Sequence, residues 1–170
     1  AWKGYGIQIQ GSRVTESQSA AGKGIPAGLY KERGVTVADN TITGYGNGIR
    51  LYLADRCELV NNRLNLQENT EFSNMGIYLS ASSGNRISGN QVSGSRNVGI
   101  YGYNGGNLNV PSENNQILKN TISDTGGDGI LLESGCNGVV VNGNRILSGK
   151  KSGIIIWGSE NCQITGNQIS

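Results

Sequence analysis

The sequence predicts an all-β fold, a solenoid of about seven coils in which parallel strands stack along one axis. Two short phrases predict it, because they alternate along the whole chain. One phrase has the form apolar-x-x-Asn-x-apolar, and the other reads Gly-Ile-x-apolar. Successive Asn of the first phrase lie 22 to 30 residues apart, which is the length of one β-helix coil with loop insertions. The two phrases therefore mark two strands of each coil.

The Asn phrase places one Asn at the same point of successive coils. Its apolar residues alternate over a segment too short for a helix, which is typical of a strand. Gly and Asn tolerate positive φ, so we expect both to lie at corners of the coil. A buried Asn amide both donates and accepts, so a column of them can hydrogen-bond along the axis. The predicted ladder contains Asn40, Asn62, Asn90, Asn120, Asn144 and Asn167, with Ser12 in the same place of an earlier copy.

The Gly-Ile phrase supplies the predicted core of the solenoid. Its full copies begin at Gly48, Gly76, Gly99, Gly129 and Gly153, and Gly24-Ile25 is a looser early copy. Side chains of a strand alternate between its two faces, so the Ile and the apolar residue two positions later are predicted to point inwards. Gly102 interrupts the second of these inward columns.

The composition excludes several kinds of site. The chain has no His, so it cannot build a Ser-His-Asp site, a Cys-His site or a His-ligated metal site. Cys57, Cys136 and Cys162 lack metal-type spacing and are interpreted as small apolar residues of the solenoid wall. The net charge is +2, and no apolar run reaches the length of a membrane span. We therefore expect no metal, no cofactor, no nucleic-acid partner and no membrane partner.

These repeats resemble those of the pectate-lyase-like superfamily over nearly the whole chain. The resemblance implies a right-handed, single-stranded parallel β-helix that forms one domain over residues 1–170. That group includes polysaccharide lyases, glycosidases, alginate epimerases and bacteriophage tailspikes. The chain lacks the His-containing motifs of polygalacturonases, the Asp-Pro-His-Glu motif of alginate epimerases and the Gly-Gly-x-Gly-x-Asp repeats of calcium-binding β-rolls. The resemblance therefore implies a fold more firmly than a reaction.

Three segments interrupt the repeat, near residues 15–23, 65–75 and 102–114, and we expect them to be loops inserted between strands. Insertions on a rigid scaffold often carry function. Both ends of the chain fall within the repeat pattern, and solenoid ends need capping elements. We therefore expect the chain to be a fragment of a longer protein, or to have its ends covered by other chains.

Aromatic residues are concentrated among the side chains of the Gly-Ile strands that point outwards. The outward stripe consists of Arg50, Tyr52, Tyr78, Tyr101, Tyr103 and Trp157. Tyr and Trp present a flat apolar face to a sugar ring while their polar edges bond hydroxyl groups, so the stripe is predicted to bind substrate. The alternatives are a subunit interface in a homotrimer, and cross-strand packing that only stabilises the sheet.

Charged residues gather at two corners of the coil. One corner carries Glu68, Glu71, Arg96, Asp124, Asp128, Lys150 and Lys151, with signs that alternate between coils. It forms either a solvated, salt-bridged edge or a cleft beside the stripe. The opposite corner carries Glu113 and Glu133 on adjacent coils, and glycoside hydrolysis needs two carboxyl groups. The candidate catalytic residues are Glu113, Glu133 and Asp128, against the alternative that they are solvated loop acids.

The sequence thus favours an extracellular or virion-surface module, similar to a phage tailspike, that binds or depolymerises bacterial surface polysaccharide. One alternative is a non-catalytic trimeric shaft. Another is a secreted or periplasmic lyase or epimerase, in which Arg50, Lys150 and Lys151 are the cations available to a uronate carboxylate.

Overall fold

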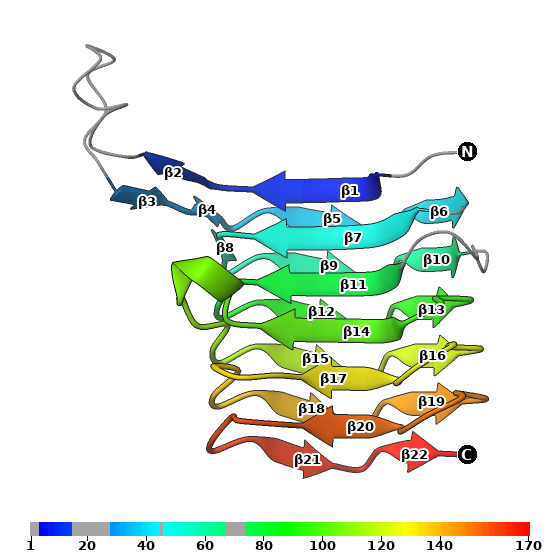
Figure 1. Cartoon of the computed structure of the whole chain (residues 1–170). Coiled ribbons are helices and arrows are strands. Elements are labelled where there is room, and N and C mark those ends of the chain that lie inside the picture. Colours follow the sequence, from blue (N-terminus) through cyan, green and yellow to red (C-terminus); the bar gives the residue numbers. More distant parts are fainter. Residues whose placement is uncertain (1–3, 15–27, 45, 67–73) are drawn as a thin grey trace.

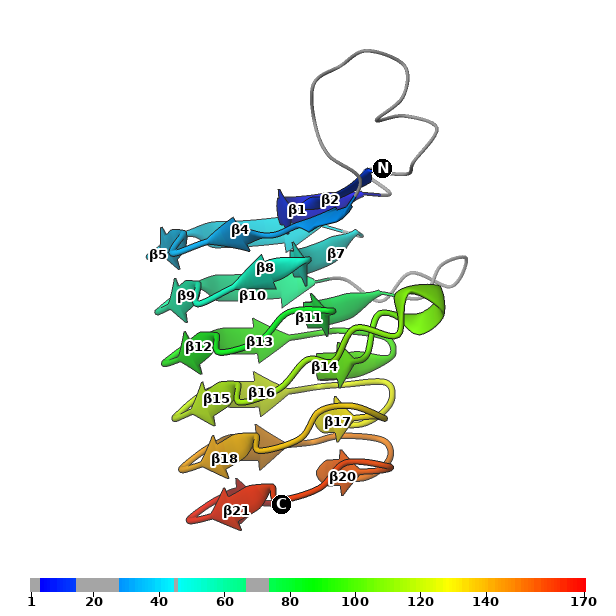
Figure 2. The same ribbon diagram turned by 90° about the vertical axis from the view of Figure 1, so that its left-hand side faces the viewer.

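The fold is a three-sided solenoid whose strands run across the axis and stack along it (Figure 1). The structure is a computed structural model that describes residues 4–14, 28–44, 46–66 and 74–170. Within these residues, three sheets of six parallel strands each form the three sides. Figure 2 shows the coils stacked one upon another along the axis. The prediction of a parallel β-solenoid is therefore confirmed.

Each side of the solenoid is one sheet. The Gly-Ile sheet contains β1 (Tyr5–Gln10), β7 (Asn47–Tyr52), β11 (Met75–Ser80), β14 (Val98–Tyr103), β17 (Ile130–Leu132) and β20 (Ile154–Ile156). The Asn sheet contains β6 (Thr41–Gly44), β10 (Arg63–Leu66), β13 (Gln91–Ser93), β16 (Thr121–Ser123), β19 (Arg145–Leu147) and β22 (Gln168–Ile169). The third sheet contains β5 (Thr36–Ala38), β9 (Glu58–Val60), β12 (Arg86–Ser88), β15 (Gln116–Leu118), β18 (Val140–Asn142) and β21 (Gln163–Thr165).

Five coils of the solenoid are complete, since the groups from β5–β7 to β18–β20 each supply a strand to all three sheets. The strand β1 and the pair β21–β22 form partial coils at the two ends. The predicted seven coils thus correspond to five complete coils and two partial ones. Among the described residues, the remaining elements are short: β2 (Ser12–Val14) pairs antiparallel with β3 (Gly28–Tyr30), and β4 (Glu32–Arg33) pairs with β8 (Ala54–Asp55).

The first coil departs from the predicted repeat. Ser12 was expected to occupy the ladder position, but it lies in β2 opposite Tyr30. The preceding segment is instead a copy of the Gly-Ile phrase, because Ile7 pairs with Ile49 and Ile9 pairs with Leu51 in the Gly-Ile sheet. The assignment of Ser12 to the ladder was therefore wrong. The looser copy Gly24-Ile25 lies outside the described residues.

The predicted inward columns form the core. Ile49, Ile77, Ile100 and Ile130 are at most 1% exposed, and Ile154, in the last complete coil, is partly buried. Burial of such side chains is the main source of stability in a solenoid. Gly102 interrupts the second inward column, and side chains of the next coil occupy the space beside it. A Cβ at Gly102 would lie 3.1 Å from Leu132 Cδ2 and 3.2 Å from Cys136 Sγ.

The Asn ladder is confirmed. At every step, the backbone N–H and the Nδ2 of one Asn both donate to the Oδ1 of the Asn in the next coil. Between Asn90 and Asn120 these distances are 2.9 and 3.0 Å. The Nδ2 of Asn90 also donates to the carbonyl oxygen of Leu59 at 2.9 Å. The ladder thus pairs polar groups that the fold removes from water.

At each corner, the residue that adopts the left-handed backbone is not the predicted one. Positive φ occurs one residue before each ladder Asn, at Asp39, Asn61, Gly89, Lys119, Gly143 and Gly166. The Gly of the Gly-Ile phrase is required for another reason, because there is no room for a side chain at its position. A Cβ on Gly76 would lie 2.3 Å from both the carbonyl oxygen of Gly99 and Val92 Cγ1. Close approach between adjacent coils, rather than a positive φ, therefore explains this Gly.

Two further polar columns were not predicted. Asn85 and Asn115 stack as the ladder residues do, with the Nδ2 of Asn85 donating to the Oδ1 of Asn115 at 3.0 Å. Ser hydroxyls form the other column, since Ser82 Oγ accepts the N–H of Ala54 and Ser112 Oγ accepts the N–H of Ser82. Both columns lie at the corner between the Gly-Ile sheet and the third sheet. Their spacing follows the same coil period, but Ser and Asn are too common in this chain to reveal it.

The cysteines and one of the predicted loops lie where the sequence suggested. Cys57 and Cys136 are buried and Cys162 is partly buried, and all three are free thiols. The 102–114 excursion includes a short 3₁₀ helix (Gly106–Leu108) that projects from the corner after β14 (Figure 2). The predicted loop at 15–23 and most of the loop at 65–75 lie outside the described residues. In the described part of the chain, no helix is long and apolar enough to cross a membrane.

Candidate functional site on the Gly-Ile sheet

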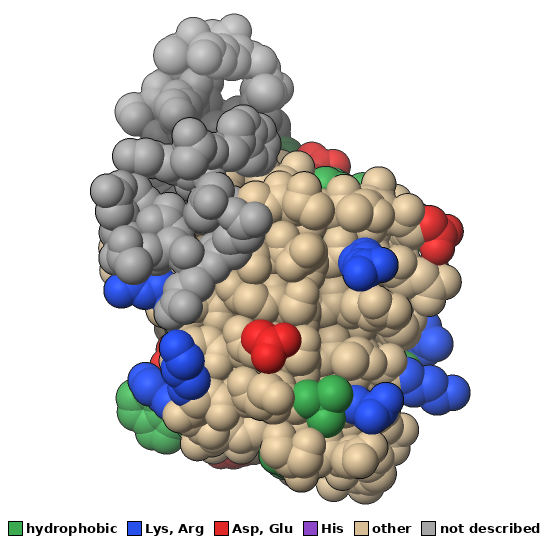
Figure 3. Space-filling view, turned by 90° about the vertical axis from the view of Figure 1, so that its right-hand side faces the viewer, with side chains coloured by type: hydrophobic (Ala, Val, Ile, Leu, Met, Phe, Trp, Pro, Cys, Tyr) green, Lys and Arg blue, Asp and Glu red, His purple; other side chains and the backbone are tan. Residues whose placement is uncertain are grey.

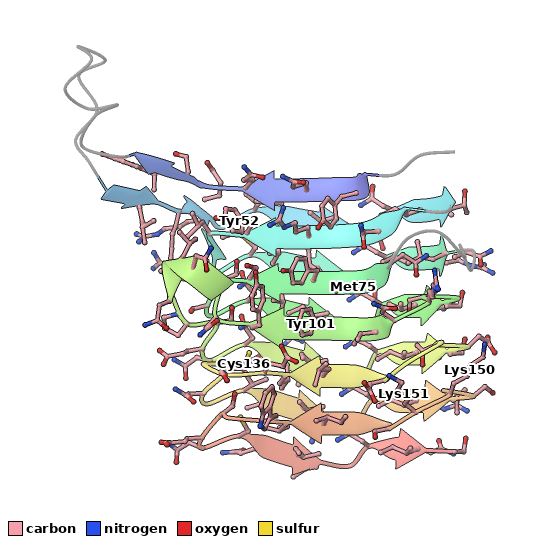
Figure 4. All side chains as sticks on the ribbon, in the orientation of Figure 1. Tyr52, Met75, Tyr101, Cys136, Lys150 and Lys151 are labelled. Carbon is pink, nitrogen blue, oxygen red and sulfur yellow. The ribbon has the colours of Figure 1, made fainter. Side chains whose placement is uncertain are left out.

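The outward stripe lies on one face of the Gly-Ile sheet, as predicted. The strand register sets two adjacent columns of outward side chains. One column contains Gln8, Arg50, Tyr78, Tyr101, Leu131 and Ile155. The other contains Gln10, Tyr52, Ser80, Tyr103, Glu133 and Trp157. Figure 4 shows Tyr52 and Tyr101 on this face, with Lys150 and Lys151 near the start of β20.

Three tyrosine rings of the stripe stack on one another. The ring centroids of Tyr78, Tyr101 and Tyr103 are 5.4 to 5.6 Å apart, and the ring planes differ by 8 to 13°. Each ring is half-buried, so part of each ring remains open to solvent. Burial raises the pKa of Tyr78, and its hydrogen bond with Tyr103 raises that pKa further. The phenol of Tyr78 therefore stays protonated at neutral pH.

Arg50 occupies the N-terminal end of the stripe and is surrounded by aromatic rings. Its Cζ lies 4.6 Å from the ring centroid of Tyr52, 5.2 Å from that of Tyr5 and 5.4 Å from that of Tyr78. Such contacts hold a guanidinium by attraction to the ring faces. Its Nε is buried and has no hydrogen-bond partner among the residues that the structure describes. The sequence predicted Arg50 for this surface but did not predict that Tyr5 would join it.

At the opposite end of the stripe, a tyrosine hydroxyl binds a carboxylate. The hydroxyl of Tyr101 donates to Glu133 Oε2 at 2.5 Å. Burial raises the pKa of Tyr101, and the hydrogen bond to Glu133 and the negative charge of Glu133 raise it further. Trp157 follows Glu133 in the same column and has 66% of its surface exposed. A phenol, a carboxylate and an open indole face therefore adjoin one another here.

The three predicted catalytic acids occupy separate places. Glu133 lies on the stripe, whereas Asp128 lies at the other end of the same strand segment, about 16 Å away at the usual rise of a strand. Asp128 Oδ1 accepts the N–H of Ser152 at 3.0 Å. Glu113 lies on the next corner, where its Oε1 accepts a hydrogen bond from Asn137 Nδ2 at 3.2 Å. Of these three acids, the structure thus brings only Glu133 onto the stripe.

The predicted charged corner is shallow and mixed in sign. Arg96, Asp124 and Lys150 line a hollow of about 200 Å³ between the Asn sheet and the Gly-Ile sheet. Arg96, Asp128 and Lys151 line an adjoining one of about 230 Å³. Figure 3 shows basic and acidic side chains on this side of the described residues, separated by large areas that carry no charge. Glu68 and Glu71, which were assigned to this corner, lie outside the described residues.

Two further kinds of site, a metal site and a reactive thiol, were sought among the described residues. These residues contain no group of three or more His, Cys, Asp or Glu side chains placed to hold a metal ion. Burial raises the pKa of the Cys136 thiol to about 12. A thiol with so high a pKa is a poor nucleophile at neutral pH.

Comparisons with known proteins identify the fold. A family model described as the right-handed β-helix region matches residues 1–169. No curated protein matches the chain at a significant level, and no solved structure does so. The β-helix fold is shared by enzymes that act on polysaccharides and by structural proteins. Its match over almost the entire length, together with the stacked parallel sheets, shows that the chain belongs to the right-handed β-helix family.

Proposed function

We propose that the chain is an extracellular polysaccharide-binding module that holds bacterial surface glycan on its outward stripe, as part of a depolymerase of the phage-tailspike kind. One observation carries the proposal. Aromatic side chains are aligned on one sheet over three successive coils, from Tyr52 to Tyr103, and Trp157 lies two coils further on, although most outward positions of a sheet facing water are polar.

A polymer lying parallel to the solenoid axis would meet a new pair of outward side chains at each coil. The Tyr78, Tyr101 and Tyr103 stack offers ring edges and hydroxyl groups, which suit sugar hydroxyls. Trp157 offers an open apolar face, which suits the face of a sugar ring. The stripe therefore combines both kinds of contact that a carbohydrate surface needs.

Glu133 is the carboxylate best placed for cleavage, since it is the acid among the described side chains of the two stripe columns. Tyr101 donates to its Oε2 and orients it. Hydrolysis of a glycosidic bond needs a second carboxyl group, and Glu113 on the neighbouring corner remains the candidate. In this proposal Glu133 acts on the bond and the aromatic residues position the polymer.

Binding of the intact chain to a panel of bacterial surface polysaccharides tests the proposal. Tyr101→Ala and Trp157→Ala should each weaken binding to the recognised polymer at least tenfold, measured by calorimetry or affinity electrophoresis. Tyr30→Ala is a matched control, because Tyr30 is 38% exposed and lies on β3, outside the Gly-Ile sheet. Unchanged binding in both stripe variants would exclude the stripe as the glycan site.

A trimeric structural shaft is the second candidate, and one observation favours it. At the C-terminal end of the stripe, Leu131, Ile155 and the exposed Trp157 are apolar neighbours of Glu133, as expected of a surface that packs against another subunit. Sedimentation equilibrium separates the candidates. A trimer that dissociates in Trp157→Glu would support the shaft, whereas a monomer that binds glycan would exclude it.

A further inference from the structure

Aromatic rings surround the guanidinium of Arg50, and no acidic side chain among the described residues pairs with it. Three rings, from Tyr5, Tyr52 and Tyr78, lie within 5.4 Å of its Cζ. Among the described residues Arg50 forms no ion pair, and its buried Nε has no acceptor. Aromatic contacts restrict the position of an arginine but leave its N–H groups unsatisfied. The rings therefore restrict the position of this charge, and within the described part of the chain its N–H groups have no acceptor.

Charge along the stripe is separated into two ends. Arg50 is the one cation in the two described columns, and Glu133 is the one anion. Three coil steps separate them, which corresponds to about 14 Å along the axis. Between them lie only the uncharged side chains of tyrosine, serine and leucine. Arg50 is thus too far from Glu133 to be neutralised by it.

We propose that Arg50 is a subsite for an anionic group, a carboxylate or a sulfate, carried by a sugar of the bound polysaccharide. This inference rests on the proposed function, and it adds the chemical class of the ligand. A planar guanidinium binds carboxylate and sulfate through two parallel hydrogen bonds. The rings around it exclude water from one side and hold the planar guanidinium in one orientation. The acidic sugar lies at the N-terminal end of the stripe, and uncharged sugars lie over the tyrosine stack.

Two matched pairs of polymers test this subsite with the intact chain. Alginate is compared with carboxyl-reduced alginate, and dextran sulfate with dextran, so that each pair differs in the anionic group. The first pair reports on a carboxylate and the second on a sulfate. The wild-type chain should bind at least one acidic polymer tenfold or more tightly than its neutral counterpart. Arg50→Gln should reduce that ratio to below threefold, because the acidic polymer loses more affinity than the neutral one.

Arg63→Gln is the matched control, because Arg63 is an exposed arginine on the Asn sheet, and it should keep the wild-type ratio. Arg50→Lys retains the charge without the planar fork and should give an intermediate ratio, which decides the question if Arg50→Gln fails to fold. A ratio near one in the wild type, or a full ratio in Arg50→Gln, overturns the subsite. Loss of binding to both members of a pair in Tyr101→Ala shows in the same experiment that the stripe itself binds glycan. If Tyr101→Ala binds every polymer normally, the proposed function fails instead.

Discussion

Asn90 lies directly over Asn120, whose single Oδ1 accepts two hydrogen bonds from it, from the backbone N–H at 2.9 Å and from Nδ2 at 3.0 Å. Both side chains are fully buried. This pair repeats between every two coils from Asn40 to Asn167, so the corner backbone of the solenoid depends on the ladder for its polar partners.

Replacing one ladder residue should destabilise the fold strongly. Asn120→Leu removes the acceptor of the Asn90 N–H, one acceptor of the Asn90 Nδ2 and the side-chain donor to the carbonyl oxygen of Ile87. We expect a loss of about 3 kcal/mol in the free energy of unfolding. Urea denaturation measures it. Gln91→Leu makes the same chemical change at an exposed position beside the ladder and should cost less than about 0.5 kcal/mol. Equal losses in the two variants would contradict the role of the ladder.

The Gly of the Gly-Ile phrase should not tolerate even one added methyl group. Gly76→Ala places a Cβ 2.3 Å from the carbonyl oxygen of Gly99, and the resulting displacement of two coils should cost about 2 kcal/mol or more. Gly28→Ala is the control, because a Cβ there meets nothing within 4 Å. Thermal unfolding should show a lower Tm for the first variant alone. A normal Tm for Gly76→Ala would mean that adjacent coils are farther apart.

Alkaline pH should destabilise the fold through the tyrosine stack. The pKa values of Tyr78 and Tyr101 are raised in the folded state, so above pH about 10, the ordinary tyrosine pKa, the unfolded chain releases protons that the folded chain retains. Stability therefore falls as pH rises above about 10. The urea midpoint at pH 9 and pH 11 measures this decrease, and absorbance at alkaline pH follows the phenolates.

The double variant Tyr78→Phe, Tyr101→Phe provides the control for this pH dependence. Without the two phenols, the decrease in stability between pH 9 and pH 11 should be smaller than in the wild type. The same decrease in both proteins would assign the pH dependence to other groups.

The three thiols should react at different rates. Burial raises the pKa values of Cys57 and Cys136, whereas Cys162 is partly exposed, and reaction needs an accessible thiolate. A chromogenic disulfide reagent at pH 8 should modify Cys162 first in the native protein and all three thiols in urea. Cys162→Ser should remove the fast reaction, and its persistence would show that one of the other thiols is accessible.

The sequence contained enough information for the sheets but not for the first coil. The ladder from Asn40 to Asn167 could be predicted because one residue type recurs at one period. Ser12 was misassigned because a six-residue pattern with a single polar position also occurs by chance. The burial of Ile7 and Ile9 against Ile49 and Leu51 decides the register there, and only the folded structure shows that contact.

The candidate site was predictable in outline for the same reason. Alternation along each strand placed Tyr101 and Glu133 on the outward face, but their hydrogen bond is diagonal, since Tyr101 pairs with Leu131 in the sheet register. A diagonal contact depends on side-chain rotamers rather than on spacing. The position of Tyr5 beside Arg50 required the corrected register of β1. The sequence could therefore place residues on a face but could not pair them.

The ladder also gives the solenoid a direction along its axis. From Asn62 to Asn144, each Oδ1 accepts from the coil before it and each Nδ2 donates to the Oδ1 of the coil after it. The amide dipoles therefore point the same way and add, as peptide dipoles do in an α-helix. A coil can be duplicated, deleted or grafted from a related solenoid if its Asn keeps this orientation, whereas an inverted coil would place donor against donor. The stack is thus a modular part with a defined polarity.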